Sequence, residues 1–123
     1  MEEVLAYTAA GLVGLWGVSH AVPTRSVVAG FGEISADNRR VLVQEWLAEA
    51  VTMWSLAALV VVVTVVGGGT STADWVYRVT AGSLLVLAAL TALTGARTGV
   101  IWFKICPVLL TTSAVLLLIA GLA

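Results

Sequence analysis

Four long stretches of apolar residues alternate with short polar segments along the chain. They cover residues 4–20, 45–66, 76–95 and 101–122, and each is close to the ~20 residues that a helix needs to cross a bilayer. Isolated strands would leave unpaired backbone groups in lipid, so helices suit these stretches best. The pattern predicts an all-α fold: one integral membrane domain built as a four-helix transmembrane bundle.

The second helix is predicted to begin before the membrane. Ser35, Asp37 and Asn38 can each cap a helix start, and a helix from Asp37 to Val66 would be ~45 Å long. That length exceeds the ~30 Å hydrocarbon core. We therefore expect residues 21–44 to form a loop followed by a helical extension outside the core.

The first loop is unusually apolar. The sequence Gly30-Phe31-Gly32 stands among Val27, Val28 and Ile34. This composition predicts a short amphipathic segment that lies in the membrane interface. A lid over neighbouring polar residues is the alternative.

Composition supports a lipid environment. Apolar residues make up 60% of the chain and charged residues 11%, against roughly 45–50% and 25% in soluble domains. The net charge of -1 gives no basic field for nucleic acid. The single cysteine, Cys106, has no partner for an internal disulfide. Glu2 and Glu3 replace the basic start of a signal peptide, so we expect the first helix to be retained.

The basic residues predict an orientation. Only Arg78 is expected at the end of the bundle that holds both termini. Five basic residues are expected at the other end: Arg25, Arg39, Arg40, Arg97 and Lys104. Because basic residues accumulate on the cytoplasmic side, this bias predicts that both termini lie outside the cell.

Aromatic residues are expected at both interfaces, as in other membrane proteins. The outer belt would contain Tyr7, Trp75 and Tyr77, and the inner belt Trp46, Trp102 and Phe103. Trp16 and Trp54 lie deeper, and we expect them to pack between helices.

Two rows of small residues predict close helix contacts or, equally, a homo-oligomer interface. They are Ala6, Ala10 and Gly14 in the first helix and Ala88, Ala92 and Ala96 in the third. Pro107 would bend the fourth helix if it lay inside. We expect that helix to start near Lys104, which places the proline in its first turn.

One polar cluster is predicted near the basic end of the bundle. Glu45 and Glu49 are four residues apart and share a helix face with Asn38. Their like charges favour a nearby proton or cation. His20 is expected at the same membrane level.

Arg97 and Lys104 complete this set of six candidate ligand-binding residues, which would form a cytoplasm-facing pocket. The alternative is a network of interfacial ion pairs that only adds stability. Histidine with two glutamates is a conceivable metal-ligand set, but the spacing is not diagnostic, and we expect no metal and no cofactor.

The layout resembles that of the DoxX-like small prokaryotic membrane proteins, which also have four short helices, a long first loop and a glutamate early in the second helix. The run Gly30-Phe31-Gly32-Glu33-Ile34-Ser35-Ala36-Asp37-Asn38-Arg39-Arg40, followed by Glu45-Trp46-Leu47-Ala48-Glu49, is similar to a signature of uncharacterised bacterial and archaeal proteins. The resemblance implies a four-helix membrane fold and no particular chemistry. The small multidrug-resistance transporters are similar in size, but their first helix carries a glutamate where this one has none.

Three classes of function remain open. Because no catalytic or nucleotide motif is present, the sequence favours a non-enzymatic membrane subunit or scaffold within a homo-oligomer or larger complex. The second class is a binding protein or enzyme for a lipophilic molecule such as a quinone, sterol or lipid. The third is a small proton-coupled transporter.

Overall fold

The computed structural model describes residues 1–123 and is entirely helical. Its elements are α1 (Glu2–Ala21), α2 (Thr24–Ala29), α3 (Ala36–Gly67), α4 (Ser71–Leu93), the short 3-10 helix η1 (Gly95–Arg97) and α5 (Ile101–Leu122). Four of these segments are long and apolar enough to span a membrane. The predicted all-α bundle of four long apolar helices is confirmed.

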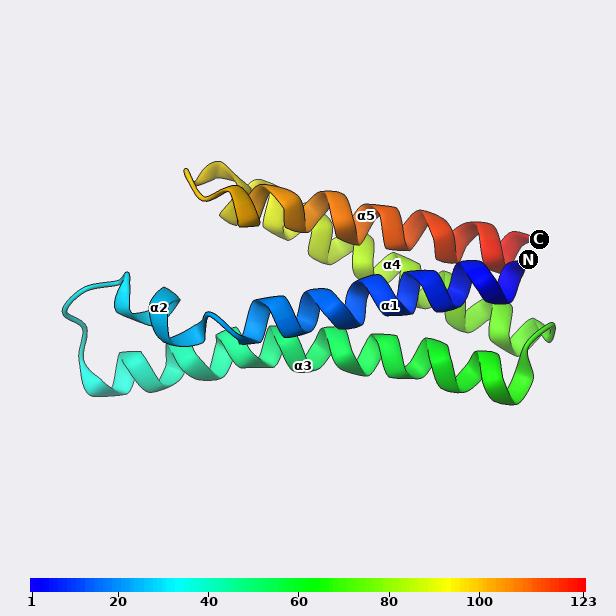
Figure 1. Cartoon of the computed structure of the whole chain (residues 1–123), viewed down its shortest axis with the longest axis horizontal. Helices are drawn as coiled ribbons and strands as arrows, with labels where there is room; N and C mark the ends of the chain where they lie inside the picture. Colours follow the sequence, from blue (N-terminus) through cyan, green and yellow to red (C-terminus); the bar gives the residue numbers. More distant parts are fainter.

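The four long helices run along one common axis (Figure 1). α1 packs closely on α3, and α4 packs closely on α5. Contacts between α1 and α5 join these two pairs, while α3 and α4 meet less extensively. Both chain termini lie at one end of the bundle, and α2 and the turn between α4 and α5 lie at the other (Figure 1).

Helix α3 is the longest element and begins where the sequence predicts. The side chain of Ser35 caps it by accepting a hydrogen bond of 3.1 Å from the backbone N–H of Asn38. Its 32 residues correspond to ~48 Å of helix, which is longer than the ~30 Å hydrocarbon core. The helical extension ahead of the apolar stretch is therefore present.

Small residues form part of the inner seams, as predicted for α1 but only partly for α4. Ala6 and Ala10 are buried on α1. On α4, Ala88 is buried, but Ala92 is exposed and Ala96 belongs to η1. The prediction of a continuous Ala88-Ala92-Ala96 seam is wrong because the helix ends at Leu93. The inner face of α4 is formed instead by Ala73, Tyr77, Thr80, Ala81, Leu84 and Ala88.

Tyr77 is not a residue of the outer aromatic belt, which corrects the prediction. Its side chain is 2% exposed, and its hydroxyl lies 2.7 Å from the hydroxyl of Thr64 on α3. The same Thr64 hydroxyl lies 2.6 Å from the Val60 carbonyl, where it can donate. A buried tyrosine needs such a partner in a membrane, where no water replaces it. This contact ties α4 to α3.

Pro107 lies inside α5, which also corrects the prediction. The helix begins at Ile101 rather than near Lys104, so the proline follows more than one full turn. Proline has no backbone N–H, and the Phe103 carbonyl therefore lacks its usual helical donor. An unpaired acceptor at the start of α5 is the result.

Candidate functional site

The site lies at the end of the bundle that carries α2 and the α4–α5 turn. The C-terminal end of α1 carries Trp16 and His20 one turn apart, so both side chains occupy one face. Helix α3 carries Trp46 and Glu49 three residues apart, and these also share a face. Close packing of α1 on α3 brings the two pairs together.

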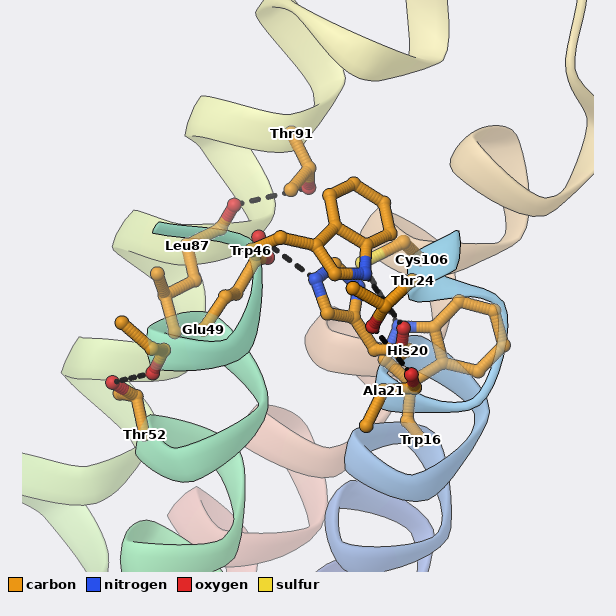
Figure 2. A network of polar contacts seen from close by, with 11 residues as sticks. Trp16, His20, Ala21, Thr24, Trp46, Glu49, Thr52, Leu87, Thr91 and Cys106 are labelled. Atoms are coloured by element: carbon orange, nitrogen blue, oxygen red, sulfur yellow. Dashed lines mark hydrogen bonds and ion pairs between the residues drawn. The ribbon is translucent and has the colours of Figure 1, made fainter. Parts of the chain in front are cut away.

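His20 is the centre of this arrangement (Figure 2). Its ring stacks on the indole of Trp46 with centroids 3.9 Å apart and planes inclined by 16°. The Trp46 indole N–H donates to the His20 carbonyl at 2.9 Å, so the ring and the backbone of His20 are both held. Phe103 from α5 packs edge-on against Trp46 with centroids 6.0 Å apart.

Glu49 reaches toward His20 from α3 (Figure 2). Its Oε2 lies 3.5 Å from His20 Nε2, which is an ion-pair distance when the imidazole is protonated. The side chains of His20 and Glu49 are 9% and 30% exposed. His20 Nε2 is buried and makes no hydrogen bond. Because buried polar atoms nearly always have partners, the Glu49 carboxylate is the group placed to interact with this nitrogen.

Trp16 and Cys106 join α1 to α5 beside this pair. The indole N–H of Trp16 donates to Cys106 Sγ at 3.1 Å, and the thiol is buried. Thr91 of α4 lies nearby, with its hydroxyl 3.0 Å from the Leu87 carbonyl, to which it donates. All four long helices thus contribute to one cluster (Figure 2).

An open cavity of about 1030 Å³ lies against this cluster. Pockets that bind drug-sized ligands typically measure about 300–1,000 Å³, so this cavity has room for such a ligand. One wall comes from α2 and its flanks, through Pro23, Val27 and Phe31, and the other from the α4–α5 turn and the start of α5, through Thr94 and Trp102. The floor holds Trp16, His20, Trp46, Glu49, Phe103 and Cys106.

The structure separates the six residues predicted for the site. His20 and Glu49 come together in the cavity. The other four are exposed and are not part of its lining: Asn38, Glu45, Arg97 and Lys104. Glu45 accepts a hydrogen bond of 3.2 Å from its neighbour Gln44 instead. No three His, Cys, Asp or Glu side chains gather closely enough to form a metal site.

Several cavity residues were assigned other positions from the sequence. Trp46 and Phe103, expected in the interfacial belt, line the cavity. Trp16 packs between α1 and α5 as expected, through its hydrogen bond to Cys106, and also lines the cavity. The sequence did contain a signal for placing the tryptophans in the site. Trp16 is four residues from His20 and Trp46 three residues from Glu49, so each pair must share a helix face. The other deep tryptophan, Trp54 of α3, packs against α1, where its indole N–H donates to the Gly14 carbonyl at 3.2 Å.

The fold and this cavity define the class: a small polytopic membrane protein whose helix ends enclose an aromatic pocket. No protein-family model, curated protein or solved structure matches the chain. The four long apolar helices agree with the layout shared with DoxX-like proteins, and no family match identifies the chain with that group.

Proposed function

We propose that the protein binds a lipophilic small molecule in the pocket formed by Trp16, His20, Trp46, Glu49 and Phe103. The observation that carries this proposal is an open cavity of about 1030 Å³ whose lining combines aromatic rings with the partly exposed Glu49 carboxylate. Aromatic walls suit an apolar ring or chain, and a few convergent polar groups suit one polar end. A subunit or scaffold role requires no such cavity, so the geometry favours the binding function.

The ligand would reach the pocket from the bilayer or its interface. Trp102 and Ile101 are largely exposed at the start of α5, and Phe31 is exposed on the α2 side. These apolar residues border the same end of the bundle as the cavity. At these three residues a lipophilic molecule meets apolar side chains. The apolar first loop, whose short helix α2 forms one wall, has the position expected of a cover.

Pocket occupancy is tested by a pair of neighbouring variants on α1. Ser19 lines the cavity, whereas Val18 is exposed and does not. We expect energy transfer from tryptophan to added pyrene, an uncharged ring, to be strong in the wild-type protein in mild detergent. Ser19→Phe places a ring inside the cavity and is expected to reduce this transfer at least about fivefold, the effect of losing about 1 kcal/mol of binding. Val18→Phe adds the same ring outside and should leave it unchanged.

Equal transfer in both variants would show that pyrene dissolves only in detergent or on outer faces, and would overturn the proposal. Native mass spectrometry of the wild-type protein from mild detergent gives a second readout. A retained small molecule that Ser19→Phe loses supports the pocket. Co-purification with a larger complex, without any pyrene transfer sensitive to Ser19→Phe, would instead support the subunit role.

We further propose that the pocket opens toward the cytoplasm. Five of the six basic residues belong to α2, the start of α3, η1 or the start of α5, which are the elements at the pocket end of the bundle. Basic residues favour the cytoplasmic side of a membrane. A reporter active only outside the cytoplasm is expected to function when fused after Ala123. The same reporter inserted after Gly32 is expected to be inactive. The reverse pattern would show the opposite orientation.

A further inference from the structure

The hydrogen-bond donors and acceptors in the pocket lining indicate what kind of ligand it can hold. This inference rests on the proposed binding function. Trp16 and Trp46 donate their indole N–H groups to Cys106 Sγ and the His20 carbonyl. Thr91 donates its hydroxyl to the backbone. Ser26 and Thr94 do the same, to the carbonyls of Pro23 at 2.9 Å and Leu90 at 2.7 Å, respectively. Most donors of the lining are therefore already used.

The acceptors of the same lining are largely free. The Glu49 carboxylate receives no hydrogen bond and has only the His20 imidazole beside it, at 3.5 Å. No lysine or arginine lines the cavity, and Arg97 and Lys104 are exposed outside it. A negative, acceptor-rich pocket repels phosphates, sulfates and carboxylates. It attracts groups that carry positive charge or N–H donors.

The aromatic residues add to this preference. Trp16, Trp46 and Phe103 line the cavity around Glu49, and Trp102 and Phe31 line its outer part. The faces of aromatic rings attract cations, most strongly indole, and rings combined with a carboxylate are a common arrangement for recognising ammonium groups. The His20 ring already contacts both kinds of group, since it lies flat on Trp46 with Nε2 next to the Glu49 carboxylate.

We infer that the ligand is a lipophilic cation, meaning an ammonium or similar positive group on an apolar body, with Glu49 as its counter-ion. The charged end would lie beside Glu49, and the apolar body along the aromatic walls. Because a protonated His20 would compete for the same carboxylate, the site accepts a cation best when the imidazole is neutral. An acceptor-only ring such as a quinone finds few free donors here.

The test compares two probes of nearly equal shape and opposite charge, tetraphenylphosphonium and tetraphenylborate, by calorimetric titration in non-ionic detergent. The titrations are done at about pH 8, where an ordinary histidine is neutral. Since the two ions enter micelles differently, the measured quantity is the affinity ratio of phosphonium to borate in each variant. We expect Glu49→Gln to lower this ratio about tenfold or more, the effect of losing one favourable charge contact.

Glu45→Gln is the matched control. Glu45 lies one turn from Glu49 on the same helix but is exposed and outside the cavity lining, so the ratio should stay at the wild-type value. Thr94→Lys supplies a second, independent variant in case Glu49→Gln folds poorly. It adds positive charge to the exposed rim of the pocket without touching Glu49, and it should also lower the ratio.

An unchanged ratio in both Glu49→Gln and Thr94→Lys would overturn the cation assignment. If pyrene transfer still depends on Ser19 in that case, the pocket binds neutral lipophiles and the proposed function survives. If neither probe set responds, both proposals fail.

A further pair of probes identifies the source of the cation. Hexadecyltrimethylammonium carries the charge alone, and hexadecylphosphocholine carries the same ammonium next to a phosphate. Preferential retention of the first in native mass spectrometry would indicate a free lipophilic amine. Preferential retention of the second would indicate a lipid headgroup, and retention of neither would contradict the assignment.

Discussion

Replacing Trp46 with alanine is expected to lower the free energy of unfolding by about 3 kcal/mol, typical of removing a large aromatic side chain from a packed site. Trp46 stacks on His20, packs edge-on against Phe103 and donates to the His20 carbonyl. The substitution removes all three contacts and joins their space to the cavity. Unfolding of the purified protein in mixed micelles with increasing SDS would measure the loss.

Trp102→Ala is the control for that substitution. Trp102 is 64% exposed, so its side chain is far less packed than that of Trp46. Its removal should cost less than about 1 kcal/mol, since mutations of exposed residues usually have small effects. Equal losses for Trp46→Ala and Trp102→Ala would contradict the central position of Trp46. They would show that α1, α3 and α5 are held together elsewhere.

Replacing Gly17 with alanine is expected to destabilise the protein by about 2 kcal/mol, within the range for forcing extra atoms into a packed interior. A Cβ at position 17 would lie 2.7 Å from Trp54 Nε1 and 3.3 Å from the carbonyl oxygen of Ala50. Both neighbours belong to α3, so α1 and α3 would have to separate. The Trp54 indole would also lose its alignment with the Gly14 carbonyl.

Gly11 on the same helix provides the matched comparison, because a Cβ there meets nothing within 4 Å. Gly11→Ala should be neutral or stabilise the protein by up to about 1 kcal/mol, as alanine favours helix over glycine. The same SDS titration serves for both variants. A stabilising effect of Gly17→Ala would mean that the seam between α1 and α3 is looser than described.

The helices could be predicted from the sequence because lipid imposes one requirement on every spanning segment. Each needs about 20 apolar residues with its backbone paired internally, and the four long helices meet that requirement. The fourth apolar stretch, 101–122, coincides with α5, but the expected position of Pro107 in a first turn near Lys104 is wrong. A proline inside a helix is tolerated in membranes when neighbouring helices support it.

Burial within the bundle was less predictable than membrane depth. Tyr77, expected to face outward, faces inward toward Thr64. Hydropathy specifies how deep a residue lies and carries little information on which helix it faces, because lipid and the bundle interior are both apolar. The same ambiguity assigned Trp46 and Phe103 to the interface rather than to the cavity.

The candidate site was predictable only in its charged centre. Glu49 and His20 stood out because ionisable residues are rare at membrane depth, and the structure brings them together. Glu45, one turn earlier, carries the same charge on a similar face but projects outside the cavity. Small rotations of α3 relative to α1 decide this difference, and those depend on packing details such as Gly17 and Trp54.

The pairing of α1 with α3 and of α4 with α5 makes the chain two helical hairpins, each with its tightest contacts inside itself. One wall of the cavity belongs to the first hairpin, through α2, and the opposite wall to the second, through the start of α5. The width of the pocket is therefore the spacing between the hairpins. The two hairpins meet mainly where α1 packs on α5, along the length of the bundle. A change in bilayer thickness or lateral pressure that tilts one hairpin against the other would therefore widen or narrow the pocket, even if it acts far from the pocket.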